Sequence, residues 1–173
     1  MCSRSLHFLC TLAVVGAFFR AGDTTAAAKL TLVEKHKSLA PIVVFESAPP
    51  YTRQAADDLA LYIEKTSGAR VQVIEGKPQP IPEHAIWVGY QPTLDTLFPK
   101  QDFDFRHAEE ILIAANNEHL VIAGRDRWDD EHLVVEGRNT TIKGKQREYG
   151  TANAVYTFLE RFLDVRWLWP GEL

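Results

Sequence analysis

Apolar positions follow two different periods along the chain, and their order predicts an α+β fold. Residues 41–46 form a short β-branched apolar run that predicts a buried strand. Residues 52–67 place apolar side chains three and four positions apart, which is typical of an amphipathic helix. Thr52 is the expected N-cap of this helix, and Gly68 supplies the left-handed residue after its end.

The middle of the chain predicts strands and one hairpin. Residues 69–76 and 84–89 have strand patterns, and residues 90–110 are expected to form a loop with a short helical turn. Two apolar runs within residues 110–124 flank Asn116 and Asn117, and Asn tolerates positive φ. We therefore expect a β-hairpin there.

The last elements complete the predicted architecture. Thr151 is the expected cap of a helix over residues 152–163, and residues 165–169 alternate like a strand. The predicted order is strand, helix, strand, strand, hairpin, helix, strand. This order predicts a single mixed β-sheet with two helices packed on it. Within the polar residues between 125 and 150, we expect a small ribbon over residues 132–137 and 139–144.

The first 28 residues have the pattern of a signal peptide. Arg4 precedes an apolar run over residues 6–19, and Ala26 and Ala28 provide small residues for cleavage before Lys29. We expect an exported protein, periplasmic or extracellular and bacterial, with residues 29–173 forming one domain. A retained N-terminal anchor is the alternative. Cleavage removes Cys2 and Cys10, so the mature chain offers no thiol nucleophile and no disulfide.

Charge and histidine spacing narrow the possible functions. The net charge is -4 and no long run of one sign occurs, so we expect no nucleic-acid partner and no membrane partner after signal removal. No two histidines of the mature chain have a metal-ligand spacing, and we expect neither metal nor cofactor. These histidines are His36, His84, His107, His119 and His132.

Carboxylates and one tryptophan are the candidate sugar-handling groups. Asp129, Asp130 and Glu131 are sequence neighbours in a polar stretch, whereas a glycosidase needs two carboxylates facing each other across a sugar. We therefore assign no catalytic residue. Trp128, flanked by Arg127 and Asp129, is the candidate for carbohydrate contact, and a tryptophan covered by its own loop is the alternative.

The chain ends on residues typical of a protein interior. Trp167, Leu168 and Trp169 are followed by Pro170 and Gly171. Chain ends usually tolerate polar residues. We expect these side chains to pack against a domain that follows Leu173. The alternative is that this strand closes the sheet and the protein ends there.

Four stretches carry a resemblance to a known family. They are AADDLALYIEKTSGARVQVI, IWVG, LVIAGRD and YGTANAVYTFLERFLDVRWLWPGE. Together they resemble the N-terminal accessory domain of secreted bacterial glycoside hydrolases, the domain that precedes the barrel in alpha-glucuronidases and beta-hexosaminidases. The resemblance extends from about Leu32 to Glu172. The stretch between AGRD and YGT is longer than this family would lead us to expect.

The resemblance implies a supporting role. It implies a non-catalytic α+β domain whose partner is a catalytic (β/α)8 barrel of the same polypeptide, acting on a polysaccharide or oligosaccharide. The packing residues would be Trp167, Leu168, Trp169 and Pro170. Two alternatives remain: a free-standing carbohydrate-binding or cell-surface module, and a small self-sufficient enzyme, for which the sequence offers no convergent acid–base pair.

Overall fold

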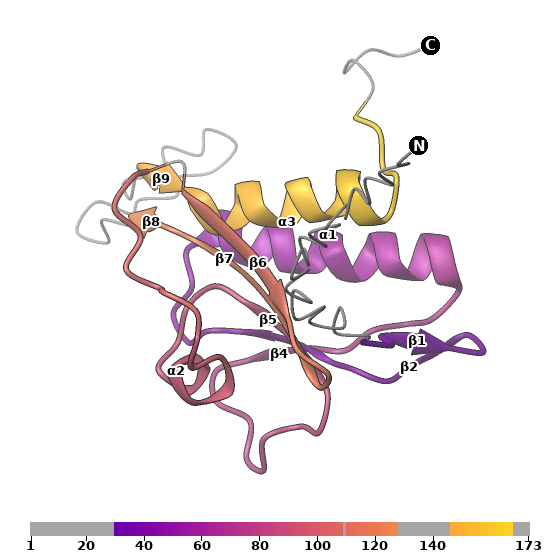
Figure 1. The fold of residues 1–173 in the computed structure, drawn as a ribbon. Helices are drawn as coiled ribbons and strands as arrows, with labels where there is room; N and C mark the ends of the chain where they lie inside the picture. The colour runs from indigo at the N-terminus through magenta and orange to yellow at the C-terminus, as the bar shows by residue number, and fades with distance from the viewer. Residues whose placement is uncertain (1–29, 109, 128–145, 168–173) are drawn as a thin grey trace, which may run out of the picture.

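A five-stranded mixed sheet forms the centre of the protein (Figure 1). The computed structural model describes residues 30–108, 110–127 and 146–167. The strand order is β4-β3-β5-β7-β6, in which β6 runs antiparallel to β7 and the other neighbours are parallel. The strands are β3 (Ile42–Val44), β4 (Val73–Glu75), β5 (Ala85–Val88), β6 (Ile111–Ala115) and β7 (His119–Gly124). The predicted α+β class with a mixed sheet is confirmed.

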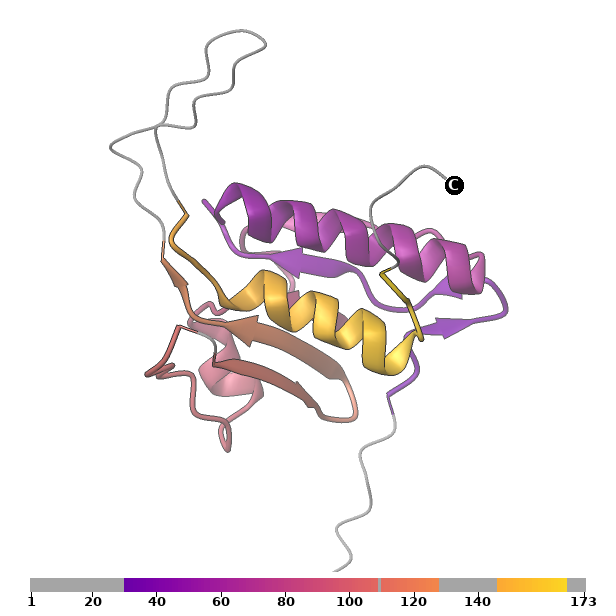
Figure 2. The ribbon, with the colours of Figure 1, turned by 90° about the horizontal axis from the view of Figure 1, so that it is seen from above.

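Helices cover both faces of this sheet. Helix α1 (Pro50–Ser67) and helix α3 (Gly150–Phe162) lie side by side on one face, and the short helix α2 (Thr93–Leu97) lies on the other (Figures 1 and 2). The strand alternation explains the two layers. Ile42, Val44, Ile86 and Val88 pack under α1 and α3, while Val43 and Trp87 face the α2 side.

Both expected N-caps are wrong. Helix α1 begins at Pro50 with Pro49 as its N-cap, because proline suits a first helical turn that needs no donor. Thr52 lies inside that turn and is fully buried. Helix α3 begins at Gly150, and the Thr151 hydroxyl instead bonds the backbone of Gly124. The predicted end of α1 is confirmed, since Gly68 has φ +72°.

The predicted hairpin is confirmed, but for a different reason. Ile111 pairs with Gly124 and Ala115 pairs with Leu120. Neither central asparagine has a positive φ. Instead Oδ1 of Asn116 accepts hydrogen bonds from the amides of Glu118 and His119, at 2.9 and 2.6 Å. The side chain therefore makes the turn through an Asx-type bond.

The expected final strand is wrong in the part that the structure describes. Residues 164–167 have no strand partner. Asp164 adopts φ +53°, as Asp tolerates, and turns the chain back at the end of α3. The amide of Val165 donates to the carbonyl of Leu159 at 3.1 Å, and Trp167 lies against both long helices. Because the chain turns back over the helices, the described residues 165–167 lie on the helix surface and not at a sheet edge.

Two small ladders complete the described structure. Strands β1 (Val33–Glu34) and β2 (Lys37–Ser38) pair with each other, as do β8 (Asp126–Arg127) and β9 (Glu148–Tyr149). The ribbon expected over residues 132–144 lies outside the described residues. In the described part of the chain, no helix has the length and apolar character needed to cross a membrane.

Candidate functional site

The carboxyl ends of β3, β5 and β7 meet at one edge of the sheet. From β3 the chain passes through α1 to β4 on one side, and from β5 it continues to β7 on the other side. The strand order therefore reverses between β3 and β5. Open α/β sheets characteristically bind ligands in the crevice outside such a switch point. We call the surface formed there by Phe45, Tyr90, Gln91, Phe103 and Arg125 the carboxyl-edge crevice.

Four aromatic side chains line the first hollow of this crevice. They are Phe45, Tyr90, Phe103 and Phe105. The hollow has a volume of about 340 Å³, and Asp104 and the end of β7 complete its wall. The Tyr90 and Phe103 rings lie 5.3 Å apart at an angle of 38°, and Tyr90 is 39% exposed. The crevice therefore presents aromatic surface directly to solvent.

Gly89 makes this aromatic wall possible. It has φ +79°, and a Cβ at this position would lie 2.4 Å from the Phe45 ring. A side chain here would force the ring away, because contacts this short do not occur. The glycine thus lets Phe45 cover the end of β5.

A second hollow of about 240 Å³ lies on the other side of Phe45 and Tyr90. Glu46, Lys77 and Gln91 also line it. Gln91 is 3% exposed, and neither of its amide atoms has a hydrogen-bond partner among the described residues. A buried polar group without a partner costs about 1–3 kcal/mol. Such a group in a native structure calls for an explanation.

Asp126 ties the crevice to both long helices. Its Oδ1 accepts a 3.0 Å hydrogen bond from the Thr151 amide in the first turn of α3. Its Oδ2 accepts a 2.9 Å bond from the Thr52 hydroxyl in the first turn of α1. Burial raises the pKa of Asp126, although these hydrogen bonds oppose the shift. A carboxylate at two helix N-termini also complements their dipoles.

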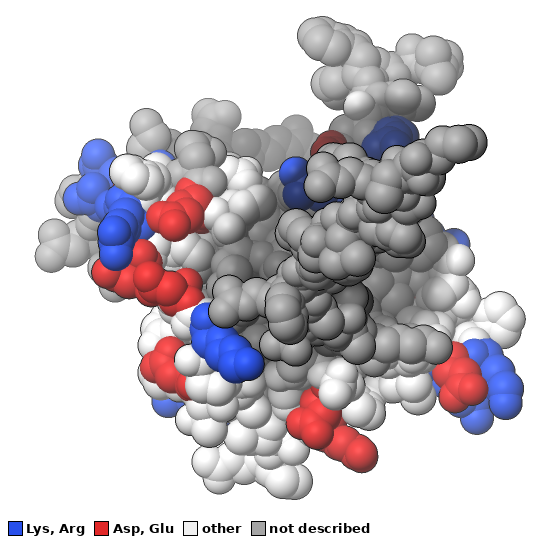
Figure 3. Space-filling model, viewed as in Figure 1, with Lys and Arg blue, Asp and Glu red and all other residues white. Residues whose placement is uncertain are grey.

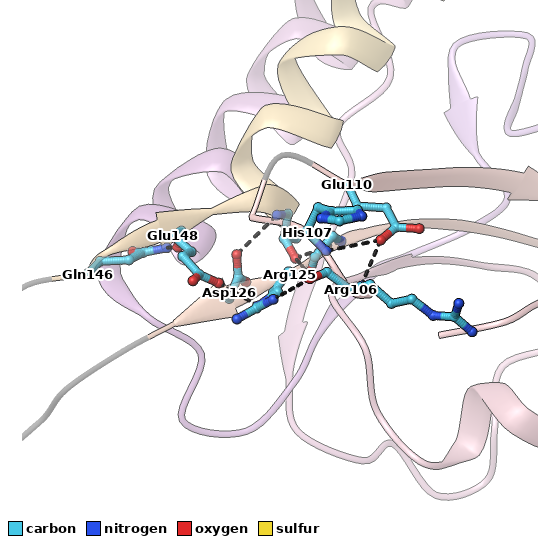
Figure 4. Close-up of polar contacts among 9 residues, drawn as sticks. Arg106, His107, Glu110, Arg125, Asp126, Gln146 and Glu148 are labelled. Atoms are coloured by element: carbon cyan, nitrogen blue, oxygen red, sulfur yellow. Dashed lines mark hydrogen bonds and ion pairs between the residues drawn. The ribbon is translucent and has the colours of Figure 1, made fainter. Parts of the chain in front are cut away.

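The neighbouring arginine makes two polar contacts through its guanidinium group (Figure 4). Arg125 forms an ion pair with Glu148 at 2.7 Å and donates a hydrogen bond to the Arg106 carbonyl, also at 2.7 Å. Nearby, Glu110 accepts bonds from the amides of Arg106 and His107, and these bonds lower its pKa. The guanidinium group therefore holds neighbouring protein segments together, and the Glu148 carboxylate beside it offsets its charge.

Close backbone packing fixes this junction. A Cβ on Gly124 would lie 2.3 Å from the carbonyl carbon of Gly150, and a Cβ on Gly150 would lie 2.3 Å from the Arg125 nitrogen. Only glycine allows the end of β7 and the start of α3 to approach this closely. The approach brings Thr151 within reach of both Gly124 and Asp126.

A second surface, which we call the Trp167 surface, lies over helices α1 and α3 and is formed by Tyr62, Tyr156, Trp167 and the groove beside them. Trp167 packs edge-on against Tyr62 and Tyr156, with ring centroids 5.3 Å away in both cases, yet it remains 45% exposed. Trp167 and Tyr156 border a groove of about 680 Å³, which Asp58 and Glu160 also line. The Tyr156 hydroxyl donates to Asp58 at 2.9 Å. Burial, and next this bond, raise the pKa of Tyr156 to about 12.

The structure places only some of the predicted site residues. Arg127 is exposed in β8, directly after Asp126. Its predicted companions Trp128 and Asp129 lie outside the described residues, as do Leu168, Trp169 and Pro170. Trp167 is placed on the helix surface. Sequence reasoning missed the crevice residues, although Phe45 lies in the first predicted strand and Tyr90 directly follows another.

The potential metal ligands among the described residues do not cluster into a metal site. No group of three His, Cys, Asp or Glu side chains in residues 30–108, 110–127 and 146–167 could hold an ion. Acidic and basic side chains are interspersed on the face shown in Figure 3.

His119 is 3% exposed beside Trp87, and burial lowers its pKa. This histidine and Trp87 are core residues.

Comparison with known proteins identifies no family. No family model matches the chain, and no curated protein sequence matches it.

Proposed function

We propose that this chain is the non-catalytic N-terminal accessory domain of an exported glycoside hydrolase that degrades carbohydrate, resembling the domain of alpha-glucuronidases and beta-hexosaminidases. Its role is to stabilise a catalytic (β/α)8 barrel of the same polypeptide. The substrate of the whole protein would be a polysaccharide or oligosaccharide.

The exposure of Trp167 is the observation that supports this proposal most directly. The indole already contacts Tyr62 and Tyr156, yet 45% of the residue stays in water. Burying an aromatic side chain is among the larger contributions to a protein interface. The adjoining groove combines aromatic surface with Asp58 and Glu160, a mixture typical of interfaces between domains.

The groove carboxylates suit a structural role better than catalysis. Asp58 accepts hydrogen bonds from Tyr156 and from Gln54, which hold its carboxylate in place. A glycosidase acid needs a raised pKa and a second carboxylate across the sugar. We therefore expect the 173-residue chain to hydrolyse neither aryl-glycosides nor glucuronoxylan. Turnover of either substrate by the purified chain would contradict the proposal.

A variant pair tests the packing role. The protein expressed from the whole reading frame, including any codons after Leu173, is compared with its Trp167→Ala and Phe162→Ala forms. Phe162 is the matched control, because it is an exposed aromatic residue, at 63%, that does not line the groove. We expect Trp167→Ala to lower the melting temperature of the barrel and Phe162→Ala to leave it unchanged. Equal effects would argue against docking through Trp167.

A further inference from the structure

The carboxyl-edge crevice is the strongest unassigned feature of the molecule. It lies at the switch point of the sheet. Its two hollows, of about 340 and 240 Å³, are both lined by Phe45 and Tyr90. The groove beside Trp167 shares none of their lining residues. Crevices of this location and mixed lining are where α/β proteins bind small ligands.

We propose that the carboxyl-edge crevice binds a neutral sugar unit of an oligosaccharide, stacked on Tyr90 and Phe103 and hydrogen-bonded to the Gln91 amide. The proposal rests on the proposed function for the source of the sugar, and on the crevice alone for the site. The contact lies at the ends of β3 and β5, and the expected contact at Trp128, outside the described residues, stays a separate prediction.

The aromatic geometry selects the shape of the ligand. Tyr90 and Phe103 already contact each other at 5.3 Å, so no slot exists between them for a planar base. A ligand must instead lie on the exposed face of the pair. The C–H face of a pyranose ring fits such a surface, because it is apolar while its rim carries hydroxyl groups.

The polar groups select a neutral polyol. The carboxylates of Asp104 and Glu46 are exposed and have no hydrogen-bond partner in the described part of the chain, so they accept bonds from hydroxyl donors. An anion is disfavoured, because carboxylates line both hollows and Glu148 offsets the charge of the Arg125 guanidinium. Lys77 is the other cation among the residues that line the two hollows, and its charge is offset by Glu46 in the same hollow.

The buried side chain of Gln91 supports the ligand site independently of the aromatic pair. The residue is 3% exposed, and neither its amide nitrogen nor its amide oxygen has a partner among the described residues. A sugar hydroxyl both donates and accepts, so one hydroxyl satisfies either atom. The protein therefore carries a polar side chain that weakens its free state and that a polyol ligand completes.

Affinity electrophoresis of the whole chain tests the site. Native gels contain xylan, glucomannan, mixed-linkage glucan or glycol chitin, and the wild type is compared with Tyr90→Ala, Gln91→Met and Trp167→Ala. Tyr90 is exposed, so its truncation leaves the core intact. Trp167→Ala is the control, since it removes an exposed aromatic residue from the other surface.

We expect at least one polysaccharide to retard the wild type and Trp167→Ala equally. Tyr90→Ala should bind the matching oligosaccharide about tenfold more weakly in calorimetry, as loss of one aromatic contact implies. Gln91→Met should also bind more weakly, because the sugar hydroxyl loses its partner. It should melt at a higher temperature, because the unpaired buried amide is gone. A merely structural glutamine would not give this pair of results.

Three results would overturn the proposal. They are no retardation on any of the four polysaccharides, retardation that Tyr90→Ala leaves unchanged, and retardation that only Trp167→Ala removes. None of them bears on docking of a barrel, which the Trp167 and Phe162 variants measure separately. Failure of the docking test would likewise leave the Tyr90 result standing.

Discussion

The hydroxyl of Thr52 donates a 2.9 Å hydrogen bond to Asp126, which lies 74 residues further along the chain. The other oxygen of the same carboxylate holds the Thr151 amide. One side chain at the end of β7 thus connects the first turns of α1 and α3. This connection fixes the two helices that carry the Trp167 surface and forms part of the wall of the crevice.

Removing the Asp126 carboxylate should destabilise the fold more than neutralising it. Asp126→Ala leaves the buried Thr52 hydroxyl and the Thr151 amide without partners, and we expect a loss of about 3 kcal/mol in the free energy of unfolding. Asp126→Asn keeps one acceptor for Thr151 and a donor for Thr52, so we expect a loss of about 1 kcal/mol or less. Urea unfolding measures both. Equal losses in the two variants would contradict the expectation that asparagine retains hydrogen bonds to Thr52 and Thr151.

The same aspartate should make stability depend on pH. Burial raises its pKa above 3.8 in the folded protein, so the folded state holds the proton more strongly than the unfolded state. The associated stability is fully present below pH 3.8 and is lost as the pH rises through the folded pKa. The wild type should therefore gain stability relative to Asp126→Asn when the pH falls from 7 towards 4. A constant difference between the two proteins across this range would contradict the raised pKa.

Gly124 should tolerate no side chain. Gly124→Ala places a Cβ 2.3 Å from the carbonyl carbon of Gly150, and rigid backbone on both sides leaves it nowhere to move. We expect a loss of about 3 kcal/mol. Gly76→Ala is the matched control, because a Cβ there meets no atom within 4 Å and only the φ of +93° opposes it. Thermal unfolding that ranks Gly76→Ala as the worse variant would contradict the close approach of β7 and α3.

Tyr156 should link the two long helices through its hydroxyl. Tyr156→Phe removes the bond to Asp58, and we expect a loss of about 1 kcal/mol at pH 7. The pKa of about 12 in the folded protein exceeds the ordinary 10.0, so wild-type stability should fall as the pH rises from 10 to 12. The phenylalanine variant should show a shallower fall in chemical unfolding over that range. Parallel curves would mean that Tyr156 ionises as freely as in the unfolded chain.

Periodicity predicted the elements that bury a continuous face. Ala55, Leu59 and Ile63 repeat at helical spacing and form the buried side of α1, and Gly68 ends the helix as expected. The β6–β7 hairpin followed from two apolar runs with a polar turn between them. Local sequence determines such elements because one apolar face and one turn suffice to define them.

The caps and the crevice depended on distant residues. Thr52 and Thr151 have the side chains of N-caps, but Asp126 and Gly124 attract their hydroxyls across the fold. The β1–β2 turn places Lys35 and His36 at positive φ without the glycine or asparagine that usually marks it. The prediction of a final strand was wrong because the alternation of apolar residues over 165–169 does not show whether a sheet edge is available. No local pattern shows that Phe45, Tyr90 and Phe103 will meet.

Docking through the Trp167 surface is the central claim, and hydroxyl-radical footprinting tests it most directly. The oxidation rate of Trp167 is measured in the 173-residue chain and in the protein expressed from the whole reading frame, with the exposed Phe162 as internal reference. We predict that Trp167 reacts at least about tenfold more slowly in the longer protein, because burial at the interface excludes the radical. Equal rates in the two proteins, or a reading frame that stops at Leu173, would contradict the claim.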